Sequence, residues 1–271
     1  MCIAGWVWKS NPHYPLILVL NRDEFHNRES DAVGWWEWGG QKILGGRDLK
    51  AGGTWLGCTE NGRLGFLTNF REFGGIPCAK SRGDLPLKFL QSGKSPLEFA
   101  EELVCNEADM YSGFNLILSD LRSESMVYVS NRPKGGIVEV VESGIHVLSN
   151  AHLNTDWPKA VRLRGKLSGD VVKKYSMDNN KFAAKQMVEE MMMDEVKADI
   201  DTVPKNTGHE LDWELKLSSI FMETETKTKG RYGTRSQVAL SVNKDGEVSL
   251  YERYLKANFW QEHTINYRIP N

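Results

Sequence analysis

The sequence predicts an α+β fold in which strands and helices form separate layers. Segments rich in β-branched and aromatic residues occur in three blocks, and two blocks with helical spacing of apolar residues lie between them. Such segregated blocks favour a layered sandwich over a sheet in which strands and helices alternate one by one. The chain also lacks the GxGxxG and GxxxxGKS/T motifs that accompany nucleotide-binding α/β sheets.

The first block contains two pairs of strands. The segments at 2–8 and 15–23 are joined by a turn that contains Asn11 and Pro12. The segment at 54–70 is typical of a hairpin, in which Asn61-Gly62 supplies the positive φ angles of a type I′ turn.

Two helices are predicted next, at 82–93 and 95–104. The second helix has a defined beginning, because Ser95 is an N-cap residue, Pro96 occupies the first turn and Glu98 completes a capping box. Its apolar face is expected to comprise Leu97, Ala100, Leu103 and Val104.

The remaining elements are a second block of strands, two helices and a final hairpin. The strands are expected at 114–120, 125–131, 136–141 and 145–150, and the helices at 157–167 and 180–193. Met187 and the methionines at 191–193 favour core packing over a soft ligand surface, because Met commonly fills gaps in cores. The segment at 231–255 predicts a hairpin about Asp245-Gly246.

Composition and charge argue against several classes of protein. The chain of 271 residues is 40% apolar and 26% charged, and no linker divides it, so we predict one domain over 1–271. A formal net charge of −2 with dispersed basic residues argues against nucleic-acid binding. The apolar run PLILVL is too short to span a bilayer, although peripheral membrane contact stays open. Neither a secretory signal nor a transit peptide is recognisable, which predicts cytosolic synthesis.

The cysteines and histidines predict neither a metal site nor a cofactor. The four cysteines have no CxxC spacing and are expected to be reduced thiols, and the six histidines contain no i,i+4 pair. The glycine-rich segment at 45–57 lacks the features of a phosphate-binding loop and favours a tight loop between strands.

Cys2 directly precedes the first predicted strand. Removal of Met1 before this small residue would give Cys2 both a thiol and a free α-amino group. An α-amine has a pKa of about 8, so much of it is neutral near pH 7 and can accept the thiol proton. Cys2 is therefore a candidate nucleophile with its own base, although a Cys at one position alone more often packs as a small apolar residue.

Several other residues supply what this chemistry needs. If the first two strands pair as a hairpin, the end of the second strand lies near Cys2. A cation lowers the pKa of a thiol, a carboxylate orients an amine, and Asn amides donate to an oxyanion. The candidates for these roles are Arg22, Asp23, Asn69, Asn150 and Arg235. Each has an ordinary structural interpretation by itself, such as a turn Asn or a surface ion pair, and only the joint pattern indicates a site.

These segments resemble the NRDE family, also called the Transport and Golgi organisation protein 2 family. The resemblance rests on MCI at the start, NRDE at 21–24, the glycine-rich segment at 45–57 and TNFRE at 68–72. LSNAHLNTDWPK at 148–159 and YGTRSQ at 232–237 extend it over essentially the whole chain.

The resemblance implies a fold like that of the N-terminal-nucleophile hydrolases, a four-layer α-β-β-α sandwich with two antiparallel sheets. The choloylglycine hydrolases and acid amidases share a pattern onto which Cys2 and the five candidates map in order. In that pattern the Asp lies three positions after the Arg, whereas Asp23 directly follows Arg22. Adjacent strand residues face opposite sides, so both reach Cys2 only if the strand bulges or ends there, and Glu24 is the alternative carboxylate.

Two functions follow as hypotheses, within a family associated with secretory and Golgi organisation, lipid, acyl-coenzyme A and haem. The first is a Cys2-dependent hydrolase of amide or thioester bonds. The second is a non-catalytic binding or trafficking protein for an amphipathic ligand, namely acyl-coenzyme A, a lipid amide or haem. For the second, Trp35, Trp36 and Trp38 in a loop-like region are candidate ligand contacts, with capping of the sheets as the alternative. The resemblance further implies Golgi or mitochondrial association, and the sequence does not indicate the oligomeric state.

Overall fold

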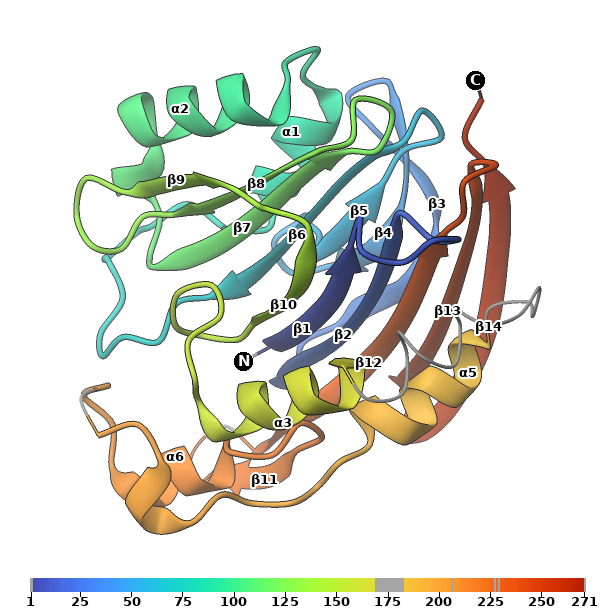
Figure 1. The fold of residues 1–271 in the computed structure, drawn as a ribbon. Helices are drawn as coiled ribbons and strands as arrows, with labels where there is room; N and C mark the ends of the chain where they lie inside the picture. Colours follow the sequence, from blue (N-terminus) through green and yellow to red (C-terminus); the bar gives the residue numbers. More distant parts are fainter. Residues whose placement is uncertain (1, 169–182, 206, 227, 229, 271) are drawn as a thin grey trace.

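Two antiparallel seven-stranded sheets form the centre of the molecule (Figure 1). The structure is a computed structural model that describes residues 2–168, 183–205, 207–226, 228 and 230–270. No helix in these ranges has the length and apolar character needed to cross a membrane.

Sheet I contains the first two strands of the chain and the last ones. Its strands are β1 (Cys2–Trp8), β2 (Leu16–Phe25), β10 (Gly144–Leu148), β11 (Glu223–Thr226), β12 (Gly230–Val242), β13 (Glu247–Lys256) and β14 (Phe259–Arg268). They pair in the order β10-β1-β2-β12-β13-β14, with β11 paired to β12. The predicted hairpin of the first two strands is confirmed, and β1 has strand neighbours on both sides.

Sheet II contains the strands between these two groups, paired in sequence order from β3 to β9. They are β3 (Ser30–Trp38), β4 (Gln41–Asp48), β5 (Leu56–Cys58), β6 (Arg63–Asn69), β7 (Phe114–Asp120), β8 (Ser125–Ser130) and β9 (Ile137–Val140).

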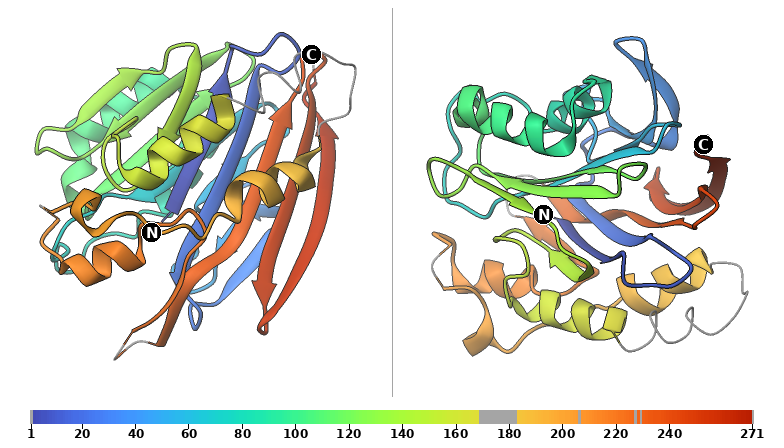
Figure 2. Two further views of the ribbon diagram at one scale, coloured as in Figure 1. Left: turned by 60° about the horizontal axis from the view of Figure 1, so that its bottom comes forward. Right: turned by 45° about the horizontal axis from the view of Figure 1, so that its top comes forward.

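Helices cover the outer face of each sheet, which gives the predicted α-β-β-α order of layers (Figure 2). The helices α1 (Asp84–Gln91) and α2 (Pro96–Asn106) pack on sheet II, and the capping box at Ser95 is present. The helices α3 (Pro158–Lys166) and α5 (Ala184–Met187) and the π-helical turn η3 (Val188–Met192) pack on sheet I. The other short helices are η1 (Ala108–Met110), η4 (Ile200–Thr202) and α6 (Leu211–Lys216).

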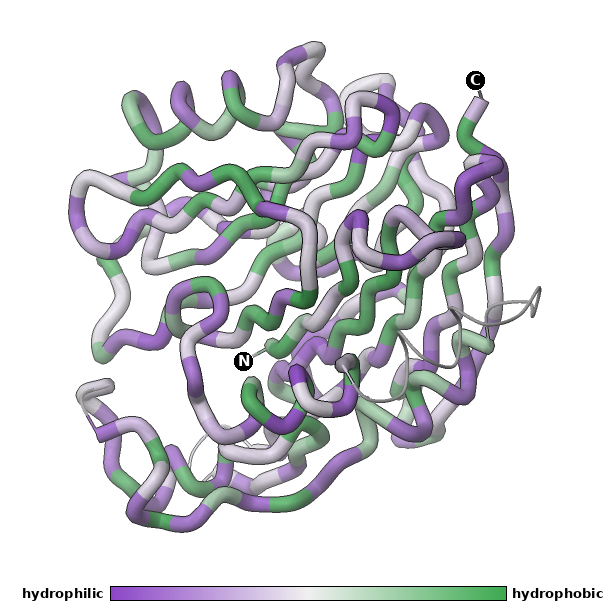
Figure 3. Tube along the Cα trace, in the orientation of Figure 1, coloured by the Kyte–Doolittle hydropathy of each residue, from purple (hydrophilic) through white to green (hydrophobic). Residues whose placement is uncertain are grey.

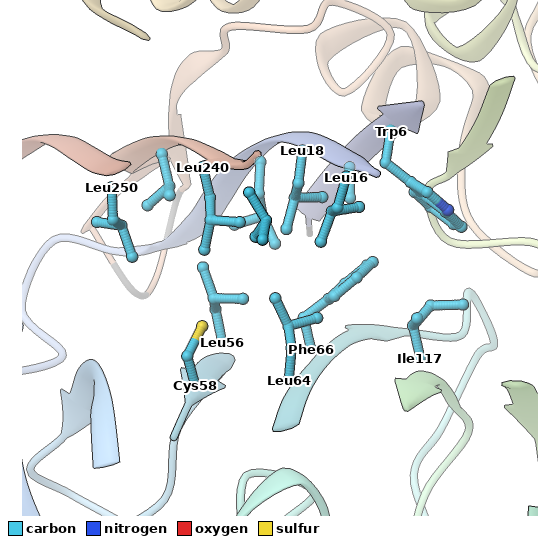
Figure 4. Close-up of a cluster of buried hydrophobic side chains, with 14 of the residues drawn as sticks. Trp6, Leu16, Leu18, Leu56, Cys58, Leu64, Phe66, Ile117, Leu240 and Leu250 are labelled. Carbon is cyan, nitrogen blue, oxygen red and sulfur yellow. The ribbon is translucent and has the colours of Figure 1, made fainter. Parts of the chain in front are cut away.

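The main core lies between the two sheets. In Figure 4, Trp6, Leu18 and Leu240 of sheet I point toward Phe66 and Ile117 of sheet II. Hydrophobic residues recur along β1 and β2 (Figure 3), because both faces of these strands are buried. Even-numbered side chains of β1 and β2 face the inter-sheet core, and odd-numbered ones face the helices on sheet I.

Several local predictions are wrong. The tryptophan segment predicted as loop-like forms strand β3, and the first residues of the segment predicted as a tight loop, 45–48, belong to strand β4. Strands β11 and β14 were not predicted. The hairpin at 54–70 is present, but its turn is not type I′, because Gly62 has a φ of 89° while Asn61 is not among the residues with positive φ. In α2, Leu97 is exposed, and Phe99 packs against the core in its place.

The methionine-rich segment packs in the core, as predicted. Met187, Met191 and Met192 are buried between sheet I and its helices, whereas Met193 is partly exposed. The first residues of the predicted helix at 180–193, numbers 180–182, lie outside the described residues.

The buried carboxylate of Glu252 joins the two sheets at one end of the inter-sheet core. Its Oε2 accepts a hydrogen bond of 2.7 Å from the backbone N–H of Val33 in β3, and its Oε1 accepts one of 2.6 Å from the Ser236 hydroxyl. The side chain is completely buried, so water cannot replace it as an acceptor.

We expect Glu252→Ala to lower the free energy of unfolding by about 2–3 kcal/mol, because the Val33 N–H is left buried without an acceptor. Chemical denaturation measures this change. The matched control is Glu139→Ala on the exposed side of β9, for which we expect less than about 0.5 kcal/mol. Equal effects of the two substitutions would show that Glu252 does not join the sheets.

Candidate functional site

Cys2 is the first residue of β1 and is held at one end of the inter-sheet layer. It pairs with Arg22 of β2, and β10 pairs with β1 from Ala4 onward. The side chain is 8% exposed and lines a hollow of about 340 Å³ (the Cys2 hollow). Burial raises the pKa of the Cys2 thiol, so the thiol needs a base to become a nucleophile.

Arg22 and Asp23 both line the Cys2 hollow although they face opposite sides of β2. Arg22 faces the inter-sheet layer, and its guanidinium lies 4.2 Å from the centroid of the Trp55 ring. Asp23 faces the helices, and its Oδ1 accepts a hydrogen bond of 2.8 Å from Thr234. The two residues line the hollow at the level of Cys2, which is the first described residue of β1 and pairs with Arg22.

The third strand around the site, β12, has a bulge at the same level. Thr234 pairs with Asp23 and Ser236 pairs with Arg22, which leaves Arg235 as the extra residue. The Arg235 guanidinium donates to the carbonyl oxygens of Phe25 and Arg28 and does not line the Cys2 hollow. The structure therefore does not bring Arg235 to Cys2, and the side chain holds the turn after β2.

Asn69 and Asn150 lie together where β6 of sheet II and β10 of sheet I end. The Asn150 Nδ2 donates a hydrogen bond of 2.6 Å to the backbone oxygen of Asn69, so this amide is engaged within the protein. The neighbouring Ser149 hydroxyl donates to the backbone oxygen of Cys2 at 3.2 Å. Asn69 lines the Cys2 hollow, whereas Asn150 lines a second hollow beside it.

The glycine-rich segment at 45–57 builds a wall of the site. A Cβ on Gly46 would lie 2.1 Å from the Trp55 ring, so only Gly lets this ring pack beneath Arg22. A Cβ on Gly53 would lie 2.4 Å from the backbone of Gly83, and the N–H of Thr54 donates to the Gly83 oxygen at 2.9 Å. These contacts place Arg82 at the Cys2 hollow.

The structure adds an ion pair that the sequence did not indicate. The Arg28 Nε lies 2.5 Å from Asp48 Oδ2, and Arg22 Nη2 lies 3.4 Å from the same oxygen. Burial opposes ionisation of Asp48, but the hydrogen bonds from Arg28 and from the Ala51 N–H, together with the charges of the two arginines, outweigh it and lower the pKa of this carboxyl. Asp48 and Arg28 are far apart in sequence and share no motif spacing, so only the fold identifies the pair.

Lys159 is a second residue that the sequence did not indicate. It lies in α3, on the face of sheet I toward which Asp23 points, and it is 2% exposed. Its Nζ has no hydrogen-bond partner among the residues that the structure describes. Burial lowers the pKa of Lys159, whereas the charge of Asp23 raises it. The only sequence signal was its position in the 148–159 segment.

A second hollow of about 300 Å³ (the aromatic hollow) adjoins the Cys2 hollow. The two hollows share Asn69, Arg82 and Ser112 in their lining, so they are adjacent parts of one cleft. Phe25, Trp213 and Tyr232 line the aromatic hollow. Within the described ranges, no group of three or more His, Cys, Asp or Glu side chains has the geometry of a metal site.

The tryptophans of β3 lie away from both hollows. Trp36 and Trp38 pack against the core under α1 and α2, and the Trp36 Nε1 donates to the Gly45 oxygen at 2.9 Å. Trp35 packs on the opposite face, against Tyr267. These contacts support the alternative that the tryptophans cap the sheets.

Some solved structures have a limited likeness to the chain. One is a mutant conjugated bile acid hydrolase from Clostridium perfringens, with 10% identity and a TM-score of 0.47, and the alignment covers 99% of this chain and 97% of that one. Another is an N-acylethanolamine-hydrolyzing acid amidase ortholog from Caenorhabditis elegans, with 16% identity and a TM-score of 0.40 over 69% and 84% of the two chains.

Sequence relatives match the chain from end to end. The Transport and Golgi organization 2 homolog of Mus musculus is 30% identical over 290 residues, and the human homolog is 28% identical over 284 residues. Both alignments cover 100% of each chain. The family described as Transport and Golgi organisation 2 matches residues 1–257. The chain therefore belongs to the Transport and Golgi organisation 2 family.

Proposed function

We propose that this protein is a Cys2-dependent hydrolase of amide or thioester bonds. The observation that carries the proposal is the position of Cys2, at the buried start of a central strand, in a hollow that Arg22, Asp23 and Asn69 also line. A nucleophile, a cation, a carboxylate and an amide donor thus meet in one place.

The base in this proposal is the α-amine of Cys2, exposed by cleavage of the Met1–Cys2 bond. A base is needed because burial raises the pKa of the thiol. Asp23 holds the ammonium form of the amine. Burial raises the pKa of Asp23, and the charge of Lys159 opposes this effect and favours the carboxylate.

The proposed reaction has two stages. The α-amine accepts the thiol proton, and the Cys2 sulfur attacks the carbonyl carbon while the Asn69 amide stabilises the oxyanion. The ammonium returns the proton to the leaving amine or thiol, and a thioester links the acyl group to Cys2. Water then attacks this thioester, its proton passes through the α-amine to the Cys2 sulfur, and the carboxylic acid leaves.

The other predicted site residues act by positioning in this proposal. Asn150 holds the end of β6 through the Asn69 backbone, and Arg235 holds the turn after β2. Acyl-coenzyme A or a lipid amide is the proposed substrate, in keeping with the cationic side chains of the cleft. Golgi association is proposed from the family description, and the mitochondrial association stays a prediction.

Cys2→Ala is expected to lower kcat/KM for thioester or amide substrates at least about 1,000-fold, because no other group replaces the nucleophile. Intact mass measured on the same wild-type preparation is expected to lack Met1. Cys105→Ala, which removes an exposed thiol in α2, is the control and is expected to leave kcat/KM unchanged. Undiminished turnover by Cys2→Ala would refute the proposal.

The pH dependence of kcat/KM tests the base. We expect kcat/KM to rise with pH as the α-amine loses its proton, with an apparent pKa of about 8. The same rising part of the pH profile is expected in Cys2→Ser. Lys159→Met removes a nearby positive charge, which raises the pKa of the amine, so the rise in kcat/KM is expected to move to higher pH by about one pH unit. Asp23→Asn removes a negative charge, so the rise is expected to move to lower pH. If neither substitution moves the pH at which kcat/KM rises, the α-amine is not the base.

A non-catalytic binding protein for haem or acyl-coenzyme A is the second candidate. It is favoured by the aromatic hollow, which places apolar rings beside the cationic side chains of the cleft.

Tryptophan fluorescence tests this second candidate. Haem or palmitoyl-coenzyme A is expected to quench the fluorescence of Cys2→Ala, and the quenching is expected to weaken strongly when Trp213→Ala is added. Trp36→Ala in β3 is the matched control and is expected to leave the affinity unchanged. If Trp36→Ala weakens the quenching and Trp213→Ala does not, the ligand contacts the tryptophans of β3 instead. If neither compound quenches the fluorescence, the binding hypothesis is refuted.

A further inference from the structure

We propose that the Cys2 hollow and the aromatic hollow form one substrate site, in which Arg82 binds a carboxylate or phosphate and the aromatic hollow binds an apolar or aromatic group attached to it. This inference rests on the proposed function only for the role of Cys2. It names the class of substrate, an acyl compound that carries both an anionic and an apolar group.

Arg82 is the cation of the cleft that has no ion-pair partner within the described part of the chain. Arg22 and Arg28 pair with Asp48, Lys80 pairs with Glu107, and Arg71 pairs with Glu214. Among the described residues, Arg82 donates one hydrogen bond, of 2.9 Å, to the backbone oxygen of Gly113. Its guanidinium therefore keeps donors for an anion, and a guanidinium binds a carboxylate or a phosphate through paired hydrogen bonds.

The backbone holds Arg82 in this position. The neighbouring Gly83 is in contact with Gly53, so the segment that carries Arg82 is fixed against sheet II. Burial lowers the pKa of Arg82, which indicates a partly dehydrated guanidinium. Such a group gains more from an anionic ligand than a hydrated surface arginine does.

The aromatic hollow has a wall of rings in mutual contact. The centroids of Phe25 and Tyr232 are 4.9 Å apart with an interplanar angle of 68°, and those of Trp213 and Tyr232 are 6.1 Å apart. The rings come from β2, β12 and α6, so three separate elements build the wall. Aromatic walls of this kind bind flat rings or hydrocarbon chains.

The order of groups along the cleft defines the ligand. Cys2 lines only the Cys2 hollow, Arg82 lines both hollows, and Trp213 lines only the aromatic hollow. A ligand whose carbonyl lies at Cys2 therefore meets Arg82 next and the rings last. Its anionic and apolar groups lie on the same side of the bond that is cleaved.

The test measures binding of four probes to Cys2→Ala by isothermal titration calorimetry. The probes are 4-(naphthalen-1-yl)butanoate, the corresponding primary amide, 3-(naphthalen-1-yl)propyl phosphate and butanoate. We expect the naphthyl acid or the naphthyl phosphate to bind at least tenfold more tightly than the amide, and the tighter of the two identifies the anion. Butanoate is expected to bind at least tenfold more weakly than the naphthyl acid.

Added substitutions assign these preferences to residues. Arg82→Gln is expected to abolish the preference for the anion over the amide, and Arg82→Lys to restore part of it. Trp213→Ala is expected to weaken both naphthyl probes equally and to keep the preference. Arg122→Gln, at an exposed position outside both hollows, is the control for loss of a positive charge. Thermal unfolding of each variant checks that it is folded.

An anion preference that survives Arg82→Gln, or no anion preference before it, would overturn the inference. Unchanged binding of the naphthyl probes to the folded Trp213→Ala variant would overturn it as well. These binding results are independent of catalysis, because they are measured on Cys2→Ala, which lacks the proposed nucleophile. If the probes bind as expected but the wild-type protein hydrolyses no acyl substrate, only the proposed hydrolase activity is contradicted.

Discussion

The rest of the site depends on the way in which β1 is fixed within sheet I. This strand has strand neighbours on both sides, and every residue from Cys2 to Trp8 is buried. The strand is held on both edges from Ala4 onward, and Cys2 is buried and paired with Arg22, so the position of Cys2 is set by the packed core. The cleft opens where this strand begins.

The cleft forms because regular pairing stops at several places at the same level. Arg22 pairs with Cys2 at the start of β1, and Arg22 and Asp23 line one hollow there despite the alternation of strand side chains. The bulge in β12 turns Arg235 away from Cys2, and the neighbouring Thr234 hydroxyl donates a hydrogen bond to Asp23. Glycines 46 and 53 then let Trp55 and Gly83 approach closely and complete the wall.

The site concentrates charged groups that a purely structural core would avoid. Asp23 and Lys159 are each 2% exposed, and burial of such groups is unfavourable for stability unless other interactions compensate. They lie where the sheet meets α3, next to the proposed nucleophile, and not at random in the core. Clusters of buried ionisable groups beside a cleft are characteristic of functional sites, which is consistent with the proposed chemistry.

Local patterns in the sequence determined the strands of the first hairpin, the capped helix at Ser95 and the order of blocks, because these depend on alternation and on neighbours a few residues apart. They also pointed to Arg22, Asp23 and Asn69, which line the same hollow as Cys2. Strand β14 was missed, and its partial exposure along the whole strand leaves little buried periodicity to detect. The ion pair of Asp48, the place of Lys159 behind Asp23 and the displacement of Arg235 were decided only by the tertiary structure. Each depends on pairing between distant segments, on a bulge or on helix packing, for which no local pattern exists.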